Sequence, residues 1–247
     1  ALEKELNFNG KIYLKCECDQ PTGSFKVRGA FNAISALTAE QKQKGVVTRS
    51  SGNFAQAVAY AANKLNIAAT IIMPNNAPAV KLEGTKKYGP TILFSGNKHE
   101  DGDLMVREQV QKNNLVPLHP YNDYTTMAGQ GTAALEILEQ LPEIDHFFCP
   151  IGGGGLMAGC ATAFKQTNEA ITTHGVEPAG AGDYHASRLS GTKQTWDTIN
   201  TIADGLRASS VGELNYPILN RYVDNISVVT DDEIKQSMKW IHEKCQM

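Results

Sequence analysis

The first residue of this 247-residue chain that could do chemistry is Lys26, which stands in the sequence Gly-Ser-Phe-Lys. Residues 11–18 alternate like a strand and residues 30–37 have the apolar spacing of a helix, so Lys26 is predicted at a strand-to-helix turn. A lysine desolvated beside an apolar ring, such as that of Phe25, loses its proton readily and can attack a carbonyl. Most lysines are solvated, however, and the position of Lys26 by itself favours an ordinary turn lysine over one that forms a Schiff base.

A run of four glycines follows a nearly all-apolar strand predicted at residues 146–151 and precedes a helix predicted at residues 156–165. The run consists of Gly152, Gly153, Gly154 and Gly155. Consecutive glycines let several backbone N–H groups converge, and the helix dipole adds positive potential at the same point. The run therefore predicts a phosphate-binding loop. It lacks the Lys-Ser/Thr of a P-loop and the spacing of the dinucleotide fingerprint, and a tightly packed glycine turn is the alternative.

A Ser-Ser-Gly-Asn sequence lies between a predicted strand at residues 46–48 and a predicted helix at residues 54–65. Its members are Ser50, Ser51, Gly52 and Asn53. The hydroxyl and N–H groups of this segment could hold a small carboxylate at the start of the helix. The same residue types also make a good N-cap, and capping is the better interpretation of this segment taken alone.

A third set of candidate groups consists of the carboxylates of Glu177 and Asp183 and the carbonyl oxygen of Ala181. Oxygen ligands of this kind suit a hard cation, either Mg²⁺ or Ca²⁺, completed by water. Two acidic residues in a loop are more often solvated than bound to a metal, so the spacing alone favours solvated side chains.

The composition is that of an ordinary globular protein, with 41% hydrophobic and 20% charged residues. A formal net charge of -3 with dispersed charges argues against a nucleic-acid partner. No apolar run is long enough to span a membrane, and the charged first residues are unlike a signal peptide, so a cytoplasmic location is expected. The five cysteines are odd in number and scattered, which predicts reduced thiols rather than a disulfide framework.

Short β-rich runs alternate with longer helical runs along almost the whole chain. Strands are predicted at residues 11–18, 46–48, 68–73, 91–94, 146–151 and up to 177, and helices at residues 30–37, 54–65, 79–88, 101–112, 131–140, 156–165 and from 231 onward. Residues 179–209 are predicted to form long loops around one short helix. The alternation predicts an α/β protein with a mainly parallel sheet covered by helices on both faces. Because the last helix runs to the final residue without a closing strand, the chain is expected to be cut, at both ends.

Several of these motifs, in this order, resemble those of the pyridoxal-phosphate enzymes of the tryptophan-synthase β fold, and within that fold the serine/threonine dehydratase and serine racemase group. The matching segments are residues 21–30, 50–53, 128–132, 150–156 and 201–205. The resemblance implies a two-domain α/β architecture (fold type II). The implied large pyridoxal-phosphate domain comprises residues 1–44 and 123–247, and the implied small inserted domain comprises residues 45–122.

The resemblance also implies how the cofactor would be held. Lys26 would form the Schiff base with pyridoxal phosphate and would remove the α-proton of the substrate. Phe25 would pack near the pyridine ring, and Asn53 would bond the 3-hydroxyl of the cofactor. The N–H groups that would hold the cofactor phosphate belong to Gly152, Gly153, Gly154, Gly155 and Leu156.

Further residues are implied for the substrate and for a cation. The residues that would receive the substrate carboxylate are Ser50, Ser51, Gly52 and Asn53. Glu177, Ala181 and Asp183 fall where this group of enzymes binds a divalent cation. Phe54 stands where the group commonly has a histidine, so the carboxylate site departs from the pattern of the group.

The implied activity is that of a serine/threonine dehydratase, an ammonia-lyase that removes the β-hydroxyl of an amino acid and yields a 2-oxo acid and ammonia. Ser51 keeps an amino-acid racemase open, because racemases of the group use a serine there and dehydratases often carry alanine. A 3-hydroxyaspartate ammonia-lyase and a non-catalytic cofactor- or amino-acid-binding protein stay open as well. The group also implies a homodimer. The residue expected to partner the pyridine nitrogen is not in this chain.

Overall fold

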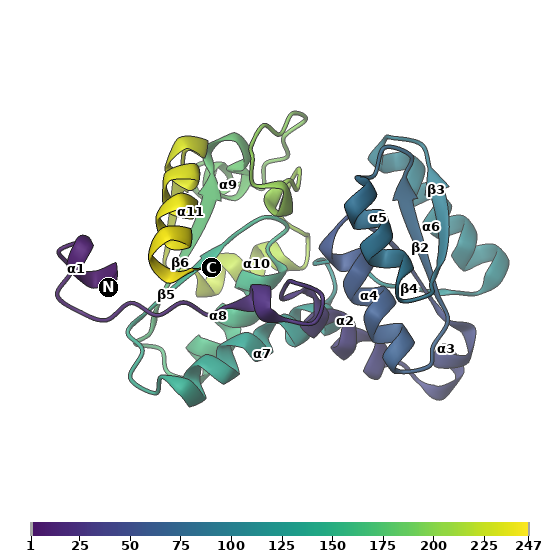
Figure 1. Cartoon of the computed structure of the whole chain (residues 1–247), viewed down its shortest axis with the longest axis horizontal. Coiled ribbons are helices and arrows are strands. Elements are labelled where there is room, and N and C mark those ends of the chain that lie inside the picture. Colours follow the sequence, from purple (N-terminus) through teal and green to yellow (C-terminus); the bar gives the residue numbers. More distant parts are fainter. Residues whose placement is uncertain (1, 247) are drawn as a thin grey trace.

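Two separate parallel sheets organise residues 2–246, the part of the chain that the computed structural model describes (Figure 1). The first sheet has the order β3-β2-β1-β4 and is built from β1 (Val46–Arg49), β2 (Ala69–Pro74), β3 (Thr91–Ser95) and β4 (Val116–Pro117). The second has the order β5-β6-β7 and is built from β5 (His146–Pro150), β6 (Thr172–Pro178) and β7 (Asn225–Val229). Parallel neighbours require crossover connections, and the helices supply them.

The helices are α1 (Leu2–Glu5), α2 (Lys26–Ser35), α3 (Ala39–Lys44), α4 (Asn53–Lys64), α5 (Ala79–Lys86), α6 (His99–Asn113), α7 (Tyr124–Gln140), α8 (Gly155–Thr167), α9 (Asp183–Ser190), α10 (Asn215–Tyr222) and α11 (Asp231–Cys245). Three short 3₁₀ helices are η1 (Glu17–Asp19), η2 (Ala179–Ala181) and η3 (Asp204–Leu206). In the first sheet the chain moves outward from β1 to β3 through α4 and α5, and then returns through α6 to β4 beside β1. Right-handed crossovers therefore place α6 on the face opposite α4 and α5.

Helix α2 joins the parts of the molecule that surround the two sheets, and Figure 1 shows it in purple between them. Its residues Val27 and Ile34 are buried in one apolar cluster with Phe54 of α4. On its other side α2 packs against α7, and a Cβ built at Gly129 of α7 would lie 2.6 Å from the carbonyl oxygen of Arg28. The close approach of α2 and α7 therefore requires glycine at position 129.

The α/β class with parallel sheets flanked by helices is confirmed, and the predicted strands and helices from residue 46 onward are present with small changes in their bounds. Helix α7 begins earlier than predicted, at Tyr124, because the carboxylate of Asp123 accepts a hydrogen bond from the N–H of Thr126 at 2.7 Å. The pattern did not predict α3, β4, α10 or β7. The division of the chain into two domains stays a prediction.

The predicted strand at residues 11–18 is wrong. This segment has no partner strand and ends in η1, and the side chains of Tyr13 and Leu14 are exposed. Alternation alone does not make a strand, because the backbone N–H and C=O groups need a neighbouring ladder. No helix within residues 2–246 is long and apolar enough to cross a membrane.

Candidate active site

Lys26 is the first residue of α2, and its Nζ donates a hydrogen bond to the carbonyl oxygen of Pro120 at 2.9 Å. The same Nζ lies 5.1 Å from the ring centre of Phe25 and 5.9 Å from that of Phe54. Desolvation lowers the pKa of Lys26 to about 8, well below that of a solvated lysine. A substantial fraction of this amine is therefore neutral near pH 8, where it can attack a carbonyl.

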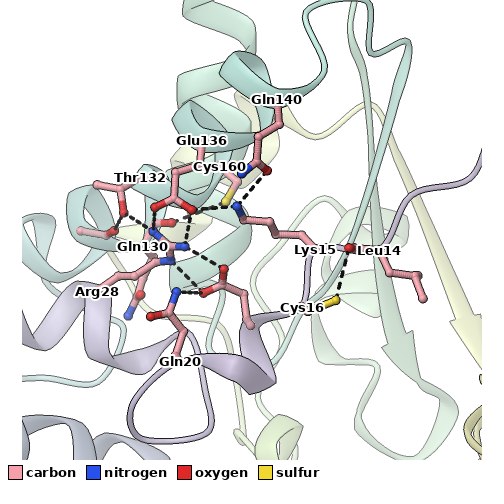
Figure 2. A network of polar contacts seen from close by, with 12 residues as sticks. Leu14, Lys15, Cys16, Gln20, Arg28, Gln130, Thr132, Glu136, Gln140 and Cys160 are labelled. Atoms are coloured by element: carbon pink, nitrogen blue, oxygen red, sulfur yellow. Dashed lines mark hydrogen bonds and ion pairs between the residues drawn. The ribbon is translucent and has the colours of Figure 1, made fainter. Parts of the chain in front are cut away.

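Arg28 holds the start of α2 in place two residues after the lysine. Its Nε donates to Glu17 of η1 at 2.7 Å and its Nη1 donates to Glu136 of α7 at 2.6 Å. Figure 2 shows the guanidinium of Arg28 beside the carboxylate of Glu136, with Thr132 and Lys15 at the edges of the network. Since Arg28 pairs with both carboxylates through two nitrogens, it fixes orientation as well as distance.

The glycine run lies at the carboxyl end of β5, and Gly155 is the first residue of α8. A Cβ built at Gly153 would lie 2.3 Å from Cγ of Tyr121, and one at Gly152 would lie 3.0 Å from Cα of Leu206. Gly154 has a φ of 89°, in the left-handed region. The loop therefore needs glycine for both close packing and backbone conformation, and it brings its N–H groups to the start of a helix, as phosphate binding requires.

The Ser-Ser-Gly-Asn segment joins β1 to α4 as predicted. Gly52 is the N-cap residue of α4, and no side chain caps this helix. The capping interpretation is therefore wrong, and the first N–H groups of α4 remain available for an anion. Ser51 and Asn53 are exposed, and Phe54 next to them is buried close to Lys26.

Residues 119–122 are the part of the site that the sequence did not reveal. They follow β4, which lies beside β1 where the strand order of the first sheet reverses. Ligands of open α/β sheets bind at such a switch point, outside the carboxyl ends of the strands. Pro120 accepts the hydrogen bond of Lys26 and Tyr121 packs on Gly153. We call Lys26 with the loops at residues 50–53, 119–122 and 152–155 the loop junction.

Glu177 and Asp183 are both buried. The carboxylate of Glu177 accepts hydrogen bonds from the backbone N–H groups of Tyr184, at 3.1 Å, and His185, at 2.7 Å, in the first turn of α9. Asp183 accepts one from the N–H of Val211 at 2.8 Å. Desolvation raises the pKa of Glu177 to about 8 and that of Asp183 to about 6.

These contacts do not by themselves require a cation. Within residues 2–246, no group of three or more His, Cys, Asp or Glu side chains could hold a metal ion. A cation at Glu177 and Asp183 would need the carbonyl oxygen of Ala181 and water as its further ligands. Both carboxylates already bind backbone N–H groups, which is a sufficient structural reason for their burial.

A cavity of about 460 Å³ lies on the Arg28 side of α2, and its lining includes Gln20, Phe31, Tyr60 and Thr132. None of the predicted site residues lines it. We therefore assign this cavity no part in the chemistry of Lys26.

Comparison with known proteins shows the family of this chain. Residues 1–247 match the model of the family described as "Pyridoxal-phosphate dependent enzyme". The chain belongs to this family. The relatives named serine racemase in Oryza sativa subsp. indica and L-threonine dehydratase catabolic TdcB in Escherichia coli (strain K12) are 44% and 43% identical to it. These matches cover 94% and 93% of this chain, and 68% and 70% of the relatives.

Solved structures of family members superpose closely. Maize serine racemase has a TM-score of 0.93 at 46% identity, covering 94% of this chain and 70% of that chain. A processed form of threonine deaminase isoform 2 from Solanum lycopersicum has a TM-score of 0.93 at 36% identity, covering 98% of this chain and 70% of that chain. Racemases and dehydratases are thus similar to this chain to nearly the same degree, and similarity alone does not select between the two activities.

Proposed function

We propose that this chain carries the active site of a pyridoxal-phosphate-dependent ammonia-lyase that converts L-serine or L-threonine to a 2-oxo acid and ammonia. The observation that carries the proposal is the amine of Lys26, which is desolvated, has a pKa of about 8 and stands at the loop junction. A protein that only binds a small molecule needs no such nucleophile. The similarity to an L-threonine dehydratase and to serine racemases supports pyridoxal-phosphate chemistry on an amino acid, which the lyase and the racemase share.

The loop junction fits the cofactor. The N–H groups of Gly155 and Leu156 belong to the first turn of α8 and have no intrahelical partner, so they suit its phosphate. Lys26 would hold its aldehyde carbon covalently. When bound, pyridoxal phosphate supplies a conjugated ring that stabilises negative charge at the α-carbon of the substrate.

The protein groups would then bind the substrate and move its proton. The uncapped start of α4 would hold the substrate carboxylate through backbone N–H groups, with Ser50 and Ser51 beside it. Nζ of Lys26, once neutral, would accept the α-proton. The carbonyl of Pro120 orients this nitrogen by accepting its hydrogen bond. Departure of the β-hydroxyl and addition of water complete the net conversion of the amino acid to the 2-oxo acid and ammonia.

Ser51 is the observation that favours the second candidate, an amino-acid racemase. Its side chain is exposed, and it comes from the β1–α4 loop whereas Lys26 comes from α2. Two acid/base groups on different elements could serve opposite faces of one α-carbon, as racemisation requires. A third candidate, 3-hydroxyaspartate ammonia-lyase, would use the same residues on a substrate with a second carboxylate.

The test is proton NMR of the protein with pyridoxal phosphate and L-serine or L-threonine in D₂O, followed by a chiral assay of the remaining amino acid. A 2-oxo acid with little D-amino acid supports the lyase, and abundant D-serine supports the racemase. The Ser51→Ala variant should lose racemisation far more than elimination. Equal loss of both would assign Ser51 to carboxylate binding alone.

A non-catalytic binding protein is the candidate from another class. It predicts that L-serine, L-threonine and 3-hydroxyaspartate show neither product nor α-deuteration, and that the protein with pyridoxal phosphate keeps the same absorbance after Lys26→Ala. Loss of the yellow colour in Lys26→Ala would instead support the enzyme.

Two further parts of the proposal concern the assembly and a cation. We propose a homodimer, which sedimentation equilibrium would test and a monomer at all concentrations would contradict. A Mg²⁺ or Ca²⁺ ion at Glu177, Ala181 and Asp183 is proposed because two buried carboxyl groups and a backbone carbonyl of one short segment are oxygen ligands of the kind that a hard cation takes.

A further inference from the structure

The turn at residues 119–122 leaves the first sheet almost at once, because β4 is only two residues long. The last contacts with β1 are made by Leu118, whose N–H donates to the carbonyl of Val47 at 2.8 Å and whose carbonyl accepts from Oγ1 of Thr48 at 2.8 Å. Beyond Leu118 the backbone N–H groups of the turn are no longer paired with a neighbouring strand. Their hydrogen-bond partner must come from elsewhere.

His119 supplies that partner. Its Nδ1 accepts hydrogen bonds from the N–H of Asn122 at 2.8 Å and from the N–H of Tyr121 at 3.3 Å. Its ring also meets the ring of Tyr121 edge to face, with centres 4.6 Å apart. One side chain therefore closes the turn on itself and fixes the direction of the tyrosine.

The closed turn touches three parts of the loop junction and its surroundings. The carbonyl of Pro120 accepts from Lys26, and the ring of Tyr121 lies where a side chain on Gly153 would lie. Oδ1 of Asn122 accepts from the N–H of Leu214 at 2.9 Å. The position of this turn therefore helps to set the surroundings of Lys26 and the packing of the glycine loop.

His119 must be neutral to act in this way, because a proton on Nδ1 would remove both hydrogen bonds. The charged groups around it are Arg49 of β1, Asp103 of α6, Lys26 of α2 and Asp123 before α7. Desolvation first, and then the positive charge of Arg49, hold the pKa of His119 well below its usual range, against the opposite influence of the two aspartates. The ring therefore remains an acceptor at Nδ1 throughout the range in which Lys26 titrates.

We propose that His119 is a positioning residue of the active site: by accepting the N–H groups of Tyr121 and Asn122, it holds the turn that encloses the amine of Lys26 and supports the glycine loop. The inference rests on the proposed function only in taking Lys26 as the reactive amine. It concerns the protein before any cofactor binds, so it can be tested without turnover.

The test compares His119→Leu, which removes the acceptor, with His119→Asn, whose Oδ1 can take the place of Nδ1. The rate of acetylation of Lys26 in the cofactor-free protein is followed against pH by mass spectrometry. In the unaltered protein the midpoint should lie near pH 8. In His119→Leu it should move up by about one pH unit as water reaches the amine, whereas His119→Asn should keep the original midpoint.

The control is Thr38→Ala, which removes the N-cap of α3 away from the loop junction. It should lower Tm without moving the midpoint of Lys26, so that a loss of stability is separated from a loss of positioning. If His119→Leu does not fold, His119→Ala decides, since alanine also has no side-chain acceptor. An unchanged Lys26 midpoint in the folded acceptor-free variant, whatever its Tm, would overturn the inference. Such a result would leave the proposed ammonia-lyase untouched.

Discussion

Lys81 of α5 forms an ion pair with Asp204 of η3, although the two residues are 123 positions apart in the sequence. A Cβ built at Gly52 would lie 3.7 Å from Nζ of Lys81, so the lysine stands beside the loop at residues 50–53. On the other side, Leu206 at the end of η3 packs against Gly152. The pair therefore links the predicted substrate loop to the predicted phosphate loop.

Breaking this ion pair should change substrate binding more than stability. The side chains of Lys81 and Asp204 are 30% and 61% exposed, so the pair should contribute no more than about 1 kcal/mol to the free energy of unfolding. We expect Asp204→Asn to raise KM several-fold, because the two loops are no longer held together, with little change in Tm. The charge-reversed double variant Lys81→Asp/Asp204→Lys should recover much of the loss. Equal KM values for Asp204→Asn and the unaltered protein would contradict the proposal that this ion pair holds the two loops together for substrate binding.

The desolvation of the Lys26 amine, which its chemistry requires, should lower the free energy of unfolding of the cofactor-free protein. Below its pKa of about 8 the folded protein must hold a charged amine away from water, and this penalty disappears as the pH rises from about 8 towards the pKa of a free lysine. Lys26→Met should therefore raise the free energy of unfolding of the cofactor-free protein at pH 7 by about 1–2 kcal/mol, while abolishing turnover.

Urea unfolding at pH 7 and pH 10 checks this prediction, because the gain should be smaller at pH 10. The matched control is Lys112→Met, whose side chain is 70% exposed. A gain of equal size in both variants would contradict the role given to burial.

The Arg28 network of Figure 2 should be a main source of stability at the start of α2. The Arg28 side chain is only 8% exposed, and Arg28→Lys keeps the charge but loses the forked pairing with Glu17 and Glu136. We expect a loss of about 2–3 kcal/mol in urea unfolding at pH 7. Glu40→Gln, which breaks an exposed pair with Lys44, should change stability far less.

The Arg28 network should also make the stability of the protein depend on pH in the acid range. Hydrogen bonds from Arg28 and Lys15 lower the pKa of Glu136 to about 2. The stabilisation from this carboxylate is therefore fully present above the ordinary pKa of a glutamate and is lost as the pH falls towards 2. Arg28→Lys should accordingly show a smaller loss of stability between pH 5 and pH 2.5 than the unaltered protein. A parallel acid profile in both proteins would argue against the network.

Glu177 and Asp183 should make the stability of the protein depend on pH in the opposite direction. In the folded chain the pKa values of Glu177 and Asp183 are raised to about 8 and about 6. Between the ordinary pKa of each carboxyl group and its raised pKa, the folded state therefore binds more protons than the unfolded state. The free energy of unfolding should fall as the pH rises from about 4 to about 8. The measurement is Tm against pH, with and without Mg²⁺ or Ca²⁺.

A cation bound to the two carboxylates should restore Tm at pH 8, and EDTA should reverse the effect. Glu177→Gln, which has no charge to bury, should leave only the pH dependence of Asp183, which ends near pH 6, and should remove the response to metal. If added Mg²⁺ and Ca²⁺ do not change Tm at pH 8, the proposed cation is wrong. Glu177 and Asp183 then serve only to bind backbone N–H groups of α9 and of Val211.

The sequence by itself determined the α/β class, most of the strands and helices after residue 46, and the three motifs built around Lys26, Gly52 and Gly153. These features could be predicted because they are local. Helical and strand spacing, glycine conformation and the behaviour of N–H groups at a helix start depend on residues that are near one another in the chain.

The tertiary structure alone decided which distant segments meet. The strand predicted at residues 11–18 failed because no other strand pairs with it, and the two-residue β4 forms only because β1 lies beside it. That pairing brings His119 and Pro120 to Lys26, and the folding of η3 against the glycine run brings Asp204 to Lys81. No pattern within a single segment contains these contacts, since each depends on the relative position of elements about a hundred residues apart. The sequence therefore specified the chemical groups of the site, and the fold decided which backbone carbonyl, ring and counter-charge surround them.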